Sequence, residues 1–116
     1  MELIGYSKCG TCQKARKYLS ARDIRYVWRE ITEKPPTMEE LRGILYSGVE
    51  LKRLLNTSGQ VYRELNIKEM LVSMDVEEVL RLLSKNPMLV KRPILMTCDG
   101  NTLVGFNEEE WNKTIK

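Results

Sequence analysis

The sequence predicts a mixed α/β fold in which a block of helices interrupts a small sheet. A strand-helix-strand pattern occupies the first 34 residues, helical periodicity extends over 37–86, and two strand-like runs precede a last helix. At 116 residues, the chain is long enough for one domain with a hydrophobic core and too short for two of ordinary size. We therefore expect a single domain, with a core from 1–34 and 88–116 and a helical insertion at 35–87.

The first part of the chain has the pattern of a β-α-β unit. Glu2–Tyr6 is short and partly apolar, which favours a strand. The next segment has small and apolar residues at helical spacing, at Cys12, Ala15 and Leu19. Arg25–Ile31, with the sequence RYVWREI, alternates as a half-buried strand does. A helix between two strands predicts that the strands pair in parallel.

The helical block is marked by capping residues. Thr37 and Glu40 have the spacing of a capping box, and Gly48 is placed to end the helix that they begin. Asp75 repeats the capping pattern for a later helix, which Pro87 ends. Two shorter helical segments are expected between them, at 51–55 and 61–71.

Two strands and a helix are predicted at the end of the chain. Asp99-Gly100 lies between the runs 93–97 and 102–106, which is a strong signal for a β-hairpin. Asn107 is placed to cap a last helix with an acidic first turn and a basic end, as the helix dipole favours. Without the helical block, this order of strands and helices is that of the thioredoxin fold.

Composition excludes several classes of protein. The net charge of +3 is mild, and acidic residues alternate with the basic ones, so no direct contact with nucleic acid is expected. No apolar run approaches the roughly 20 residues of a membrane helix. The first residues, MELIGYSK, lack the basic region and cleavage site of a signal peptide. We expect a cytoplasmic, monomeric protein that does not bind a membrane.

The motif KCGTCQKARK, at residues 8–17, contains two of the three cysteines of a chain that has no histidine. A structural zinc site needs four thiolate or imidazole ligands, which one chain of this composition does not supply. The lack of histidine also excludes a cysteine-histidine nucleophilic pair. An odd number of cysteines argues against a secreted disulfide framework. No metal or bound cofactor is expected, and redox chemistry at Cys9 and Cys12 is the remaining interpretation.

The two cysteines are expected to have different roles. Cys9 lies where a strand passes into a helix, so the free amides of the first helical turn and the charge of Lys8 favour its thiolate. Gly10, Thr11 and Lys8 are also candidates for binding an anionic substrate beside it. Cys12, one turn into the helix, is expected to be more buried. We interpret Cys9 as the nucleophile and Cys12 as the thiol that resolves a mixed disulfide.

A second candidate element is Arg92-Pro93. In a thioredoxin order, the proline that begins the third strand is commonly cis and lies opposite the cysteine pair. If Pro93 is that residue, the Arg92 guanidinium could bind the Cys9 thiolate or an oxyanion substrate. Cys98, beside the predicted hairpin turn, is expected to have no redox role.

Four motifs carry a resemblance to a known family: KCGTCQKARKYL, LLNTSGQVYRELN, NPMLVKRPIL and LVGFNEEEW. In this order around a helical insertion, they resemble the ArsC family, which includes glutaredoxin-coupled arsenate reductases and the Spx and MgsR transcriptional regulators. The resemblance implies a thioredoxin-like fold with an all-helical insertion between the second and third strands.

The resemblance also implies roles for single residues. It makes Cys9 the nucleophile and Arg92 an oxyanion ligand. The arsenate reductases use two further arginines, but Asn56 stands at one of these positions, and no basic residue occurs at 102–111, where the other falls. The reductases usually lack a cysteine at the position of Cys12, whereas Spx and MgsR have the pair.

Two functions follow as hypotheses. The first is a cytosolic thiol-disulfide oxidoreductase that acts on a disulfide, a glutathione adduct or arsenate, with thioredoxin, glutaredoxin or glutathione as reductant. The second is a redox-switched regulator that binds the C-terminal domain of the RNA polymerase α subunit, as the resemblance to Spx implies. A stable module in which the pair forms a disulfide only incidentally is a third alternative.

Overall fold

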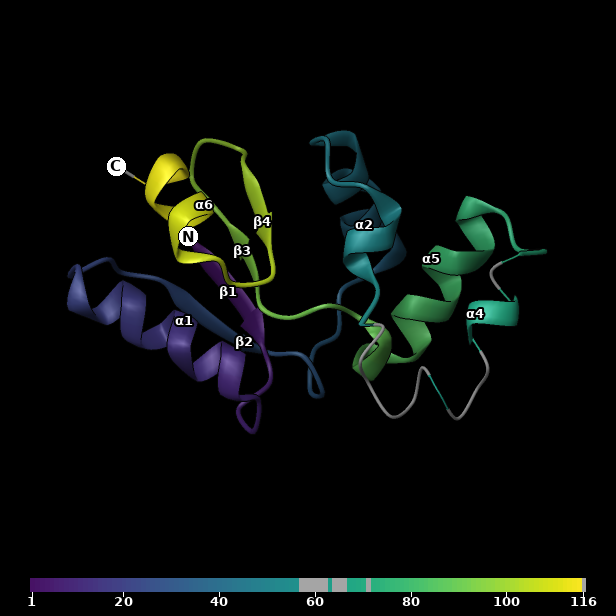
Figure 1. Ribbon diagram of the computed structural model, residues 1–116, viewed down its shortest axis with the longest axis horizontal. Coiled ribbons are helices and arrows are strands. Elements are labelled where there is room, and N and C mark those ends of the chain that lie inside the picture. Colours follow the sequence, from purple (N-terminus) through teal and green to yellow (C-terminus); the bar gives the residue numbers. More distant parts are fainter. Residues whose placement is uncertain (57–62, 64–66, 71, 116) are drawn as a thin grey trace. The chain divides into compact units, whose positions relative to one another are not determined.

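The computed structural model of the protein describes residues 1–56, 63, 67–70 and 72–115. The chain divides into two compact units, one formed by Met1–Lys34 and Arg92–Lys116 and the other by Pro35–Lys91. The elements that Figure 1 labels, together with two 3₁₀ helices, follow one another as β1 (Glu2–Gly5), α1 (Gly10–Ala21), β2 (Val27–Glu30), α2 (Met38–Tyr46), the 3₁₀ helix Leu51–Leu54, α4 (Ile67–Met70), α5 (Val76–Lys85), the 3₁₀ helix Pro87–Leu89, β3 (Ile94–Met96), β4 (Thr102–Val104) and α6 (Glu108–Thr114). The predicted order, β-α-β, helices and then β-β-α, is confirmed.

The first unit is built on a four-stranded sheet with the strand order β2-β1-β3-β4. β1 pairs in parallel with β2, as predicted, and antiparallel with β3, which in turn forms the predicted hairpin with β4. Because β1 and β3 run in opposite directions, the end of β1 and the beginning of β3 lie at the same edge of the sheet. The segment that follows Gly5 and the Arg92-Pro93 pair are therefore brought to one edge.

One face of this sheet packs against α1 and α6. Leu3, Leu95 and Leu103 are neighbours in the strand register and form a row of buried side chains on this face. Leu19 of α1 and Trp111 of α6 belong to the same core cluster, and both are fully buried. Trp111 is thus a core residue of this unit. This packing fixes α1, and with it the cysteine pair, against the sheet.

Element boundaries differ from the sequence predictions by one to a few residues. β1 ends at Gly5, so Tyr6 belongs to the segment that leads to Cys9. β2 begins at Val27, two residues later than predicted. β4 ends at Val104, because Gly105 adopts a φ of 76° that turns the chain away from the strand direction.

In the second unit, the capping residues correctly predicted the ends of α2 and the start of α5. The Thr37–Glu40 capping box is complete, with the Thr37 N–H donating to Glu40 Oε1 at 3.0 Å and the Glu40 N–H to Thr37 Oγ1 at 3.1 Å. Gly48 follows α2 with a φ of 107°. Asp75 Oδ1 accepts from the Glu78 N–H at 2.8 Å at the start of α5.

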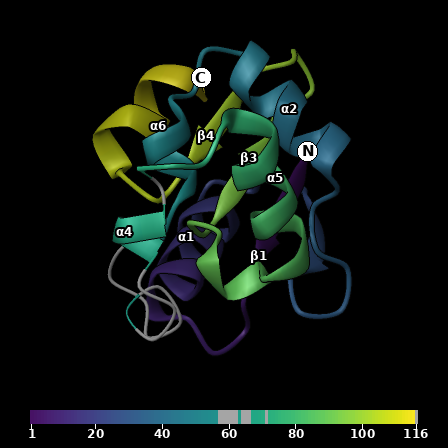
Figure 2. The same ribbon diagram turned by 90° about the vertical axis from the view of Figure 1, so that its right-hand side faces the viewer.

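α2 and α5 pack against each other within this unit (Figure 2). Arg42 of α2 and Glu77 of α5 form a two-pronged ion pair, with Arg42 Nη2 2.7 Å from Glu77 Oε2. Most of the predicted helical segment at 61–71 lies outside the described residues. The part that the structure describes includes α4. Among the residues that the structure describes, no helix has the length and apolar character needed to cross a membrane.

Candidate active site

Cys9 lies at the junction of β1 and α1. It is the N-cap residue of α1, with extended backbone angles (φ −92°, ψ 123°), and its N–H donates to the Tyr6 carbonyl at 3.0 Å. Its side chain is half-buried, and Gly10 and Thr11, the first two residues of the helix, are exposed. The predicted junction is therefore correct, and the sulfur of Cys9 faces the amides of the first helical turn, where negative charge is favoured.

Cys12 lies one turn further along α1 and is fully buried. Its Sγ accepts a hydrogen bond from the Tyr6 N–H at 3.4 Å. It lies against Gly5, where an added Cβ would be only 3.1 Å from Cys12 Sγ and 2.7 Å from Cη2 of Trp28. The absence of a side chain at Gly5 thus gives room to the Cys12 sulfur and the Trp28 ring together.

The environments of the two thiols separate their pKa values. Burial raises the pKa of Cys9, but hydrogen bonds from the Cys12 N–H, the Cys12 thiol and the Thr11 N–H, with the charge of Arg92, hold it below its usual value. Burial raises the pKa of Cys12 to about 12, and the hydrogen bond to Cys9 and the Cys9 charge act in the same direction. Both cysteines are free thiols. The accessible sulfur is therefore the one that ionises first.

Arg92 and Pro93 lie at the edge of the sheet where β3 begins. The Arg92-Pro93 peptide bond is cis, and the Pro93 carbonyl accepts from the Gly105 N–H at 2.8 Å. The half-buried Arg92 side chain has its guanidinium carbon 5.5 Å from the centre of the Tyr6 ring. Its charge lowers the pKa of both cysteines. The structure thus places Arg92 and the cysteine pair in one electrostatic environment.

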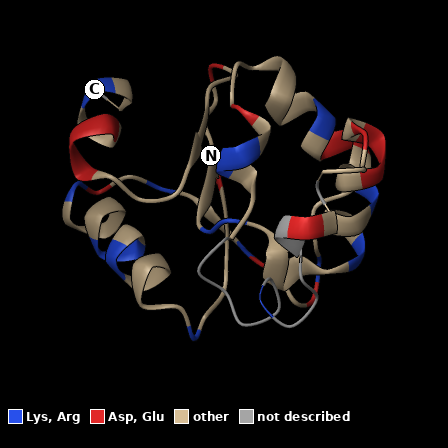
Figure 3. Cartoon of the chain, turned by 45° about the vertical axis from the view of Figure 1, so that its right-hand side comes forward, with Lys and Arg blue, Asp and Glu red and all other residues tan. Residues whose placement is uncertain are grey.

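The remaining predicted site residues have less contact with the sulfurs. The backbone N–H of Thr11 is one of the groups that lower the pKa of Cys9. Gly10 has no atom within 4 Å of the position that a Cβ would take, so the space beside it is open. Lys8 is exposed. It precedes a helix that carries lysine and arginine and no acidic residue, as Figure 3 shows.

Sequence reasoning missed the side chains that hold the segment between Gly5 and Cys9. The Ser7 N–H donates to Oε2 of Glu30 at 3.0 Å, and the Ser7 carbonyl accepts from Nε2 of Gln13 at 2.7 Å. The signal that could have found Glu30 is its place at the end of β2, since parallel strands β1 and β2 end at the same edge of the sheet.

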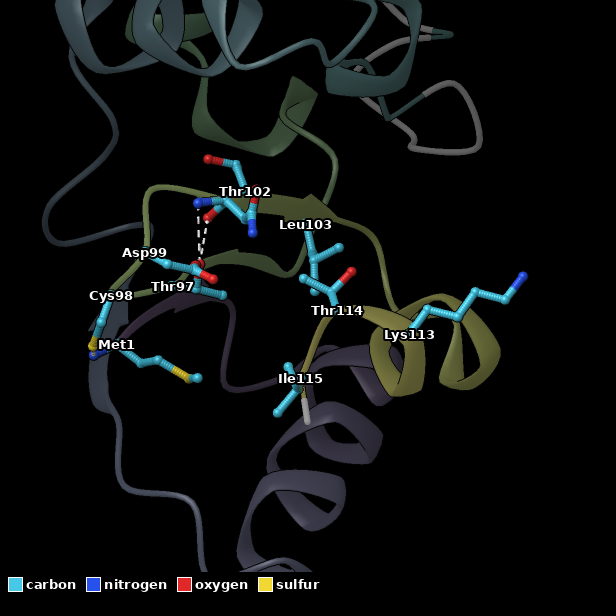
Figure 4. Close-up of a pocket in the computed structure, with 10 residues that line it drawn as sticks. Met1, Thr97, Cys98, Asp99, Thr102, Leu103, Lys113, Thr114 and Ile115 are labelled. Atoms are coloured by element: carbon cyan, nitrogen blue, oxygen red, sulfur yellow. Dashed lines mark hydrogen bonds between the residues drawn. The ribbon is translucent and has the colours of Figure 1, made fainter.

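Cys98 lies at the opposite end of the sheet from Cys9, because it follows β3 at the end where β1 begins. It is exposed, and its Sγ accepts from the N-terminal ammonium group of Met1 at 3.3 Å. Both residues line a cavity of about 730 Å³ with Asp99, Thr102 and Lys113 (Figure 4). This cavity contains none of the residues of the cysteine pair.

Asn56, which stands at an arginine position of the arsenate reductases, and the acidic and cysteine side chains bear on anion and metal binding. Asn56 lies in the helical unit, where its N–H donates to the Leu89 carbonyl at 2.7 Å and its side-chain amide to the Met88 carbonyl at 3.4 Å. Among the described residues, no group of three or more Cys, Asp or Glu side chains is arranged to hold a metal ion.

Known proteins resemble this chain in sequence and in structure over nearly its whole length. The model of the ArsC family matches residues 4–114 of the chain. The uncharacterised protein YusI of Bacillus subtilis is 46% identical over 110 residues, which cover 93% of this chain and 92% of YusI. The regulatory protein MgsR of the same bacterium is 35% identical over 112 residues, which cover 96% of this chain and 86% of MgsR. The crystal structure of an ArsC family related protein from Bacteroides fragilis superimposes with a TM-score of 0.90 at 45% identity, covering 97% of this chain and 94% of that chain.

Proposed function

Because the chain belongs to the ArsC family, with a Cys-x-x-Cys pair in a thioredoxin-like fold, we propose that it is a thiol-disulfide oxidoreductase. Cys9 is the nucleophile and Cys12 the resolving thiol. The observation that carries the proposal is the contrast between the two sulfurs, since Cys9 is accessible with a lowered pKa and Cys12 is fully buried with a raised one.

The first step is attack of the Cys9 thiolate on one sulfur of a substrate disulfide. A new bond forms between Cys9 Sγ and that sulfur, the substrate S–S bond breaks, and the other substrate sulfur leaves as a thiolate that takes up a proton. The amides of the first turn of α1 and the Arg92 guanidinium stabilise negative charge at Cys9 before attack.

In the second step, Cys12 releases its proton and attacks Cys9 Sγ, which forms the Cys9–Cys12 disulfide and releases the remaining substrate thiolate. The mixed disulfide assists this step, because Cys9 then carries no negative charge to raise the pKa of Cys12. Two electrons pass from the dithiol to the substrate. An external dithiol such as thioredoxin or glutaredoxin, or two molecules of glutathione, returns the pair to the dithiol state.

The site favours a disulfide or a glutathione adduct as substrate over arsenate. The charge of Arg92 acts on both cysteines. At the positions of the two further arginines of the arsenate reductases, this chain has Asn56 and the non-basic run 102–111. Each missing charged hydrogen bond costs about 1.5–3 kcal/mol of oxyanion binding.

Steady-state turnover tests this proposal. The wild-type chain is supplied with oxidised glutathione, a glutathionylated peptide or arsenate, with thioredoxin or glutaredoxin and its NADPH-dependent reducing system. We expect turnover with a disulfide substrate that is lost in Cys9→Ser and retained in Cys98→Ser. Absence of turnover with every substrate and reductant would reject the proposal.

A second candidate function is a redox-switched regulator. It is supported by the 35% identity to a protein named as a regulator, over 86% of that protein's length. In this case, oxidation of the cysteine pair would alter binding to the C-terminal domain of the RNA polymerase α subunit. A pull-down with that domain, under reducing and under oxidising conditions, decides it. Absence of binding under both conditions rejects this function.

A further inference from the structure

Glu30 contacts both the segment that leads to Cys9 and the Trp28 side chain, which lies near Cys12. It is the last residue of β2 and lies opposite Gly5 in the parallel register. Its Oε2 accepts from the Ser7 N–H at 3.0 Å, and its Oε1 accepts from the indole Nε1–H of Trp28 at 3.2 Å. One half-buried carboxylate thus holds both the segment that leads to Cys9 and an aromatic ring of the sheet.

The Trp28 ring is in turn part of the environment of Cys12. A Cβ built on Gly5 would lie 2.7 Å from Cη2 of Trp28, 3.0 Å from its Cζ3 and 3.1 Å from Cys12 Sγ. Ring and sulfur therefore share the space above Gly5. The hydrogen bond from the indole Nε1–H to Glu30 holds the ring in the orientation in which it lies beside this sulfur.

The Ser7 peptide groups are fixed from two sides. Glu30 accepts from the Ser7 N–H, while Gln13 of α1 donates to the Ser7 carbonyl at 2.7 Å. Ser7 itself is exposed, so its position depends on these side-chain contacts and not on burial. Two residues later, Cys9 begins the helix.

We propose that Glu30 is a positioning residue of this site, a role that rests on the proposed oxidoreductase function. Its carboxylate fixes the segment that carries the nucleophile Cys9 and, at the same time, the Trp28 ring that shields Cys12. It thereby maintains the difference in accessibility between the attacking and the resolving thiol. Glu30 takes no part in a covalent step.

The experiment measures alkylation of each thiol separately. The reduced, full-length chain is treated with iodoacetamide between pH 5 and 9, and the rates at Cys9, Cys12 and Cys98 are read by peptide mass spectrometry. The variants are Glu30→Ala, Glu30→Gln and the control Glu33→Ala, which removes an exposed carboxylate three residues further along the chain.

In Glu30→Ala, we expect the ratio of the Cys9 rate to the Cys12 rate to fall by about fivefold or more, the factor of one typical net hydrogen bond. The dependence of the Cys9 alkylation rate on pH should also change. A loss of overall stability alone would not cause this change. Glu30→Gln should give an intermediate ratio, because its amide oxygen replaces one of the two carboxylate oxygens, and the NH₂ group at the other position cannot accept a hydrogen bond. Glu33→Ala should match the wild type, and the Cys98 rate should stay constant in all variants.

A wild-type ratio and profile in Glu30→Ala would overturn the proposal, as would an effect of the same size in Glu33→Ala. If Glu30→Ala does not fold, Glu30→Gln decides, and an unchanged ratio in that variant overturns the proposal. Alkylation requires no turnover, so this result is independent of the substrate assays. A chain without oxidoreductase activity could still show the role of Glu30, and an active chain could still refute it.

Discussion

Replacing Gly5 with alanine tests the packing that positions Cys12. The added Cβ would lie 2.7 Å and 3.0 Å from two ring carbons of Trp28 and 3.1 Å from Cys12 Sγ. Turning the ring aside would break the hydrogen bond from its indole N–H to Glu30, which is 3.2 Å long. The sulfur cannot retreat freely, because Cys12 is fully buried. Gly5→Ala must therefore shift α1, the ring or the strand.

The magnitude follows from two opposing effects. Insertion of one methyl group into a packed interior costs about 1–3 kcal/mol, and the upper part of this range applies where both neighbours are held. Alanine in a strand gains about 0.5–1 kcal/mol over glycine from reduced backbone entropy of the unfolded chain. We expect a net loss of about 1.5–2 kcal/mol in the free energy of unfolding.

Urea unfolding followed by circular dichroism measures this loss. Gly43→Ala is the matched control, since Gly43 lies inside α2 and has no atom within 4 Å of its Cβ position. The control should be stabilised by about 1 kcal/mol, because alanine is the better helix former. A Gly5→Ala protein as stable as the wild type, with Cys12 alkylated no faster, would refute the packing described for this site.

Three further predictions concern charge and capping. Arg92→Gln should raise the pKa of Cys9, so that the pH profile of its alkylation moves to higher pH, and an unmoved profile would contradict the role of Arg92. The pKa of Cys12 is raised from 9.0 to about 12, so the unfolded chain loses this proton first. The protonated Cys12 thiol therefore contributes to the free energy of unfolding below pH 9, and this contribution is lost as the pH rises to about 12, by up to about 1.4 kcal/mol per pH unit. In urea titrations at several pH values, Cys12→Ser should lack this dependence on pH. Asp75→Ala should lower the free energy of unfolding by about 1 kcal/mol, whereas Asp75→Asn, which keeps an acceptor for the Glu78 N–H, should lose much less.

The parts of the fold that follow from local chemistry could be predicted from the sequence. Capping at Thr37, Asp75 and Asn107 depends on one side chain and the amide three residues later, so the sequence contains both partners. The hairpin around Gly100 is local in the same sense. The exact strand ends could not be predicted, because they depend on pairing between distant segments, as at Gly5 and Glu30.

The candidate site also has features that could be predicted from the sequence and features that could not. The placement of Cys9 at a helix start and the burial of Cys12 follow from the spacing within one helix. The contacts of Glu30 with Ser7 and Trp28 could not be predicted, because they arise only when β1 and β2 pair in one particular register. The interaction of Arg92 with the Tyr6 ring likewise needs β3 to run antiparallel beside β1.

Trapping of the mixed disulfide tests the central claim most directly. Reduced Cys98→Ser protein, with and without Cys12→Ser, is mixed with one equivalent of oxidised glutathione, and the products are mapped by mass spectrometry. We expect a stable glutathione adduct on Cys9 when Cys12 is replaced. When Cys12 is present, the adduct should give way to a Cys9–Cys12 disulfide. An adduct on Cys12, or an adduct on Cys9 that persists beside an intact Cys12, would contradict the assignment of nucleophile and resolving thiol.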